Sequence, residues 1–131
     1  MRLIAPVLVF IILFGCNTTK THTNRVDKTP NSIGDLVHTV YFSVKEGKAD
    51  SLLSACKQIQ SIPVVHNFEV GSFKDLDDPR ALTQYGIVMQ MHFKDTSDYY
   101  LYQSHPIHLK LKQQVGSMLL GPPATHDFII K

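Results

Sequence analysis

The sequence has few cysteines, little net charge and no long apolar run. Its 131 residues include two cysteines, Cys16 and Cys56, and 13 basic against 11 acidic side chains. With one cysteine beyond Cys16, the rest of the chain cannot form an internal disulfide. The charge is nearly balanced, and loss of Arg2 with a leader segment would bring it closer to neutral. Such a balance excludes the basic footprint of a nucleic-acid-binding protein, so we expect no nucleic-acid partner.

Several motifs of known chemistry are also missing. The sequence shows no internal repeat, no phosphate-binding glycine loop, no dinucleotide fingerprint, no nucleophile triad and no carboxylate pair. Each of these motifs places particular residue types at a fixed spacing because its chemistry requires that geometry. We therefore expect no cofactor.

The longest apolar run lies at residues 3–14 and ends just before Cys16. It is too short to span a bilayer, which takes ~20 residues, and has the size of the apolar part of a secretory signal. Gly15-Cys16 resembles the lipobox of bacterial lipoproteins, in which the cysteine is acylated. Residues 1–16 are therefore interpreted as a lipoprotein signal with Cys16 as the lipidation site. A plain signal peptide and an uncleaved anchor are the alternatives.

Asn17, rather than aspartate, follows the cysteine. By analogy with the sorting rule of enteric bacteria, this favours the outer membrane. We expect a protein of the bacterial cell envelope, anchored to the outer membrane through lipid on Cys16 and facing the periplasm.

Residues 17–34 are polar and lack apolar periodicity. Such a segment cannot bury enough apolar surface to offset its ordering entropy, which predicts a flexible tether. Residues 35–131 then make one small domain. A chain of this size buries a modest core, which association with a second copy would extend.

The periodicity of the domain predicts strands and helices in a definite order. Alternating apolar residues indicate four strands, at residues 36–44, 64–73, 85–94 and 125–130. Apolar stripes and capping residues indicate helices from Asp50 or Ser51 to about Ile62, from Asp95 or Thr96 to Tyr102, and from Pro106 to about Leu120. This β-α-β-β-α-β order, with the second helix broken, is that of a ferredoxin-like α+β domain.

Two details of the second strand are part of this interpretation. Strict alternation places Val64, His66, Phe68 and Val70 on one face. Gly71, near the end of the strand, indicates a bulge or a close approach of another backbone.

The break in the second helix contains the main candidate site. Residues 102–108 read Tyr-Gln-Ser-His-Pro-Ile-His. Proline cannot continue a helix but is favoured at the first position of a new one. Tyr102 should therefore end one helix and Pro106 begin the next, so that Tyr102, His105 and His108 are held near one place.

Several of these segments together resemble the stress-responsive A/B barrel family of the dimeric α+β barrel superfamily. The resemblance rests on residues 38–42, His-Thr-Val-Tyr-Phe, and on Ile62-Pro63 before the second strand. Residues 68–71, Phe-Glu-Val-Gly, the helix-break motif of residues 102–108 and the terminal Asp127-Phe128 complete it. The family implies a homodimer in which the four-stranded antiparallel sheets of two subunits pack as a barrel. Two usable sheet faces with helices for only one agree with this expectation.

The resemblance also implies possible chemistry. A few plant relatives are polyketide cyclases, and their functional residues map onto Tyr102 and His108, with His38 in the same pocket. His108 would then be a general base and Tyr102 the hydrogen-bond donor to an oxyanion. His38 and His105 are the candidate ligand-binding residues.

Each of these residues also has a structural interpretation. His38 can be a core histidine bonded to a neighbour, His105 can fix the helix break, and Tyr102 can anchor a helix end. A metal site at His105 and His108 is not expected, because the proline distorts their spacing and no third ligand joins them.

Two hypotheses of function follow. In the first, a membrane-tethered barrel binds a small apolar or aromatic ligand. In the second, a cofactor-independent lyase or cyclase uses His108 and Tyr102 in an aldol-type reaction. An open pocket in which His38, Tyr102 and His108 lie within hydrogen-bond reach of a common point favours the enzyme. A filled interior, with those side chains paired to the backbone, favours the first hypothesis.

Overall fold

The computed structural model describes residues 36–131. The expected signal of residues 1–16, with Cys16, and the tether of residues 17–34 lie outside these residues, so both stay predictions. Among the helices between residues 36 and 131, none has the length and apolar character needed to cross a bilayer.

The described residues form the expected order of elements. The strands are β1 (Leu36–Phe42), β2 (His66–Ser72), β3 (Ile87–Phe93) and β4 (Ala124–Ile129). The helices are α1 (Ala49–Cys56), α2 (Thr96–Ser104) and α3 (Pro106–Val115), with the 3-10 turns η1 (Lys57–Ser61) and η2 (Gly116–Met118). The second helix is broken into α2 and α3, as predicted.

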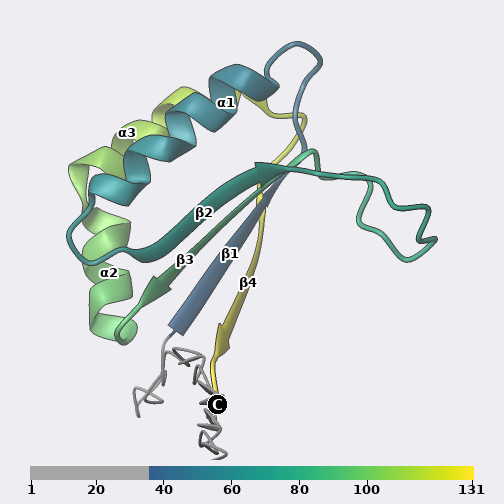
Figure 1. The fold of residues 1–131 in the computed structure, drawn as a ribbon. Coiled ribbons are helices and arrows are strands. Elements are labelled where there is room, and N and C mark those ends of the chain that lie inside the picture. Colours follow the sequence, from purple (N-terminus) through teal and green to yellow (C-terminus); the bar gives the residue numbers. More distant parts are fainter. Residues whose placement is uncertain (1–35) are drawn as a thin grey trace, which may run out of the picture.

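The strands make one antiparallel sheet in the order β2-β3-β1-β4. The central pair β1 and β3 runs in register from Leu36 opposite Phe93 to Phe42 opposite Ile87. All three helices lie on one face of the sheet, with α1 and α3 next to each other (Figure 1). This arrangement confirms the ferredoxin-like α+β fold.

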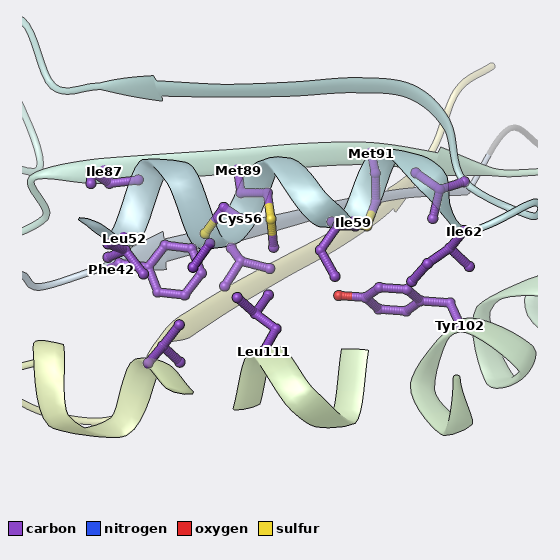
Figure 2. Close-up of a cluster of buried hydrophobic side chains, with 14 of the residues drawn as sticks. Phe42, Leu52, Cys56, Ile59, Ile62, Ile87, Met89, Met91, Tyr102 and Leu111 are labelled. Carbon is purple, nitrogen blue, oxygen red and sulfur yellow. The ribbon is translucent and has the colours of Figure 1, made fainter. Parts of the chain in front are cut away.

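Alternation along the strands determines which side chains meet the helices. In β3, Ile87, Met89, Met91 and Phe93 are buried, and the residues between them are partly exposed. They belong to one core with Leu52, Cys56 and Ile59 of the first helix and its 3-10 extension. Figure 2 shows part of this core, including Met89, Cys56 and Ile59. The core therefore lies between the sheet and the helices.

The opposite face of the sheet is more polar. Directly opposed residues of antiparallel strands share a face. The polar face carries Thr39, its two pairing partners Gln90 and His126, and the nearby His92. Thr39 Oγ1 donates a hydrogen bond to Gln90 Oε1 at 3.1 Å. Within the described residues, no helix covers this face (Figure 1).

Two local predictions were wrong. Neither Asp50 nor Ser51 caps α1, because the helix starts earlier, at a turn with Gly47 at φ +70°. Lys48 is the N-cap and makes no side-chain capping bond. Asp50 lies in the first turn, where its negative charge interacts favourably with the helix dipole.

The bulge of β2 also lies elsewhere than predicted. Pairing with β3 shifts between His66 and Glu69, where Asn67 has φ +45°. Asparagine tolerates this left-handed conformation better than most residues. The strict alternation expected from Val64 to Val70 is therefore interrupted, and Gly71 is an ordinary strand residue opposite Val88.

Candidate functional site

A cavity of about 230 Å³ lies between the helix face of the sheet and the α2–α3 corner, and it opens to solvent. Its polar side is formed by histidines, tyrosines and an amide, and its apolar side by core residues of β1, β3 and α3. The lining residues are His38, Val40, Phe42, Met89, Tyr99, Tyr102, Gln103, His108, Leu111, Lys112, Val115, Pro123 and Thr125. The structure therefore brings together three of the four predicted site residues, His38, Tyr102 and His108.

The α2–α3 corner is built by local capping. Asp95 caps α2, its Oδ1 accepting from the backbone N–H groups of Ser97 at 2.8 Å and Asp98 at 3.1 Å. Pro106 occupies the first turn of α3, where its missing N–H costs nothing. His105 ends α2 and begins α3, and its Nδ1 accepts from the Ile107 N–H at 3.3 Å.

His105 is thus the joint of the corner and is not among the residues that line the cavity. This placement matches the structural interpretation, in which the histidine fixes the bend. Its role in ligand binding stays a prediction that the cavity does not support.

His108 and Tyr102 face each other across the helix break. Their rings stack with centroids 4.2 Å apart and an interplanar angle of 28°. His108 Nδ1 donates to the Gln103 carbonyl oxygen at 3.1 Å. That carbonyl belongs to the last turn of α2, so the bond fixes the imidazole to the preceding helix.

His38 approaches the same cavity from the sheet. Its Nδ1 lies 2.5 Å from Asp127 Oδ1, and the two residues are directly opposed in the β1–β4 pairing. Its ring contacts Tyr99 and Tyr102 edge-on, at centroid distances of 5.3 and 6.0 Å. The histidine itself is buried, whereas the Asp127 side chain is 46% exposed.

Asp127 is a partner of the candidate site that the sequence does not reveal. It was noted as part of the family resemblance but was not connected with His38. The signal was available, because a ferredoxin-like order pairs the last strand with the first and so opposes the two residues. Without the register of that pairing, however, the partner of His38 cannot be chosen.

The hydrogen-bond partners determine which ring nitrogens carry protons. A carbonyl oxygen and a carboxylate can only accept, so the Nδ1 atoms of His108 and His38 must be the donors. In the neutral ring the lone pair is then on Nε2. Among the described residues, neither Nε2 atom has a hydrogen-bond partner. A neutral imidazole at His108 therefore keeps a proton-accepting nitrogen for a ligand.

Burial keeps His108 neutral. Loss of solvent lowers its pKa, and the nearby Lys112 and His38 lower it further, while the bond to Gln103 acts in the opposite direction. The imidazole is therefore uncharged at neutral pH and available as a base.

The role of Tyr102 as a hydrogen-bond donor to an oxyanion stays a prediction. Burial raises the pKa of its phenol well above the usual value, so the hydroxyl stays protonated and can donate a hydrogen bond. Figure 2 shows its hydroxyl directed into the apolar cluster around Ile59 and Leu111. Its ring stacks on that of His108, and the residue is part of the cavity lining.

The one cysteine among the described residues is not a nucleophile candidate. Cys56 is completely buried, and burial raises the pKa of its thiol to about 12. The thiol stays protonated and packs as a small apolar side chain.

The family comparison covers nearly all of the described chain. The model of the Stress Responsive A/B Barrel Domain family, Dabb, matches residues 36–128. No curated protein matches the chain.

Solved structures share the fold at low sequence identity. A Dabb family protein with a ferredoxin-like fold from Mesorhizobium loti is 22% identical, with a TM-score of 0.62, and the match covers 75% of this chain and 98% of that one. A dimeric ferredoxin-like protein of unknown function from Thermobifida fusca is 18% identical, with a TM-score of 0.61 and coverage of 76% and 93%. The hydroxynitrile lyase of Passiflora edulis is 14% identical, with a TM-score of 0.63 and coverage of 73% and 93%. At these identities the likeness establishes the fold alone.

Proposed function

Because the chain belongs to the stress-responsive A/B barrel family, we propose that it binds a small apolar or aromatic molecule in the cavity between α3 and the sheet. The observation that carries this proposal is the cavity of about 230 Å³ itself, which is open, apolar on one side and polar on the other. Binding sites for small molecules combine an apolar lining with a few convergent polar groups in this way.

The binding proposal is tested with a neutral fluorescent probe, N-phenyl-1-naphthylamine, and a variant that fills the cavity. Thr125 lines the cavity from β4 and is exposed, so Thr125→Phe adds a ring there without overfilling the core. The control is Thr83→Phe, an exposed loop position that does not line the cavity. We expect the probe to bind the wild type and the control and to bind Thr125→Phe at least ~10-fold more weakly, the loss of about 1.4 kcal/mol. Equal binding by all three proteins would refute the site.

A second function, cofactor-independent lyase or cyclase chemistry, is favoured by the state of His108. Its neutral ring presents an unpartnered Nε2 to the cavity. In an aldol-type reaction this nitrogen would remove a proton next to a carbonyl, the carbanion would attack a second carbonyl carbon, and the same proton would return to the new alkoxide. Tyr102, whose hydroxyl stays protonated, and Gln103 both line the cavity, and either can donate a hydrogen bond to the enolate oxygen.

Proton abstraction can be measured without knowing the substrate. In D2O, α-hydrogen exchange of 4-phenyl-2-butanone followed by NMR should be faster with the wild type than without protein. His108→Gln should abolish the acceleration, and the exposed His126→Gln should not. Acceleration that survives His108→Gln would exclude His108 as the base.

We also propose that two copies associate through the sheet face that carries Thr39, Gln90 and His126. The T. fusca relative is described as dimeric, and a sheet with helices on one face needs a second cover. Gln90→Glu puts a charge on this face, and Gln113→Glu puts the same charge on an exposed position of α3. Sedimentation should show weakened association for Gln90→Glu only. A monomeric wild type would exclude the dimer.

The envelope location is a separate proposal that rests on Gly15-Cys16 and the apolar run before it. In a bacterial host, the protein should incorporate labelled palmitate and fractionate with membranes. Cys16→Ser should abolish both, and a wild-type protein found unlabelled in the soluble fraction would contradict the proposal.

A further inference from the structure

The cavity has one formally charged residue in its lining, Lys112. It lies one turn after His108 on α3, and residues four apart on a helix are neighbours on its surface. His108, Leu111, Lys112 and Val115 thus form the helix face toward the cavity. The charge is near enough to His108 to contribute, after burial, to the lowering of its pKa.

Lys112 also lines a second hollow. A groove of about 350 Å³ follows the end of α3 and the loop before β4, and its lining shares Lys112, Val115 and Pro123 with the cavity. The rest of this groove is apolar or small: Gly116, Leu119, Leu120, Gly121 and Pro122. Lys112 is therefore shared by the linings of the two hollows, and it is exposed to solvent.

No carboxylate neutralises this ammonium within the part of the chain that the structure describes. The ion pairs there join His38 to Asp127 and Arg80 to Asp78, and Lys112 takes part in neither. Asp127 is already hydrogen-bonded to His38, one of the cavity histidines. The mouth of the cavity thus presents an unpaired positive charge one helical turn from the neutral imidazole of His108.

We infer that the ligand of this cavity is an organic anion, with its carboxylate or phenolate paired with Lys112 and its apolar body inside the cavity. The inference rests on the proposed binding function and specifies its ligand class. Lys112 is a specificity-determining residue in this arrangement. Low-dielectric walls strengthen the attraction between ligand and lysine relative to a pair in water.

A matched pair of ligands tests the charge. The anion 2-naphthoate and the neutral 2-naphthamide have nearly the same shape, and competition with N-phenyl-1-naphthylamine reports the affinity of each. We expect the wild type to bind 2-naphthoate roughly 3- to 5-fold more tightly, the upper part of the range for an exposed ion pair. The preference should shrink as salt rises from 20 to 500 mM, because the pair lies near solvent.

Variants of α3 assign the preference to one side chain. Lys112→Gln should reduce the carboxylate preference, measured as the ratio of the two affinities on the same variant, to less than ~2-fold. Lys110→Gln removes the same charge from an exposed position outside the cavity and should keep the preference. Circular dichroism checks that both variants fold.

The possible outcomes separate this inference from the binding function. If naphthoate and naphthamide bind the wild type equally, or if Lys112→Gln keeps the preference, the anion inference is overturned while binding in the cavity stands. If the neutral probe and both naphthyl compounds all fail to bind, the binding function fails and the inference fails with it.

Discussion

Asp127 is the residue whose replacement tests the geometry of the candidate site most directly. Its carboxylate accepts a hydrogen bond from a histidine that is 4% exposed. A hydrogen bond with a charged partner contributes about 1.5–3 kcal/mol to stability, and a partly exposed acceptor belongs at the lower end. Asparagine keeps the size and one acceptor oxygen but loses the charge, so Asp127→Asn should lower the free energy of unfolding by about 1 kcal/mol.

Asp127→Ala should cost more, because it leaves the buried Nδ1–H of His38 without an acceptor. We expect about 2 kcal/mol, the middle of the range for an unsatisfied buried donor. For a domain of this size, each 1 kcal/mol lowers Tm by about 4–8 °C. Urea unfolding followed by circular dichroism measures both variants. The protein concentration is held fixed, because dissociation of a dimer would add to the apparent stability change.

A double-mutant cycle identifies the interaction responsible. His38→Phe keeps a ring against Tyr99 and Tyr102 but removes the nitrogen. In that background Asp127→Asn should cost close to nothing. Glu46→Gln makes the same carboxylate-to-amide change at an exposed turn and is the control. The His38–Asp127 pair does not stabilise the fold as described if Asp127→Asn lowers the free energy of unfolding no more than Glu46→Gln does. The same holds if the loss is equal with and without His38.

Three further measurements concern the corner that holds His108. The pKa of His108 is lowered in the folded state, so its contribution to stability is present above the usual pKa of about 6.5 and is lost as pH falls toward the lowered value. His108→Gln should therefore make the free energy of unfolding, measured in urea, depend less on pH between pH 5 and 7. An unchanged pH dependence would contradict this. Asp95→Ala should lower the free energy of unfolding by about 1 kcal/mol by uncapping α2, whereas Asp95→Asn should cost much less in the same urea assay. His105→Ala should cost about 0.5–1 kcal/mol by uncapping α3, with probe affinity unchanged; a large loss of affinity would instead place His105 in the binding site.

The fold was predictable because its signals are local and mutually consistent. Buried Met89 and Met91 alternate with more polar residues, the Asp95 cap begins α2, and Pro106 begins α3 where its chemistry requires a break. The element order then leaves few arrangements of four strands. The start of α1 and the bulge at Asn67 were missed because both depend on left-handed backbone at single residues, which the apolar pattern does not encode.

The site was predictable only in part. The helix-break motif placed Tyr102 and His108 together, and the strand alternation put His38 on the helix face. The hydrogen bond between His38 and Asp127 depends on the register of two strands, because the two residues are 89 positions apart in the chain. The direction of the Tyr102 hydroxyl depends on the side-chain rotamer, which packing determines. Such choices are made by the tertiary structure.

The junction of α2 and α3 restricts how the cavity can open. His105 is the final cap of one helix and the first cap of the next, so no linker residue separates them. The bond from His108 to the Gln103 carbonyl fastens the two helices a second time. A hinge at this point would have to break both attachments at once. We therefore expect the corner to move as a unit when the cavity widens, so that Tyr102 and His108 stay stacked.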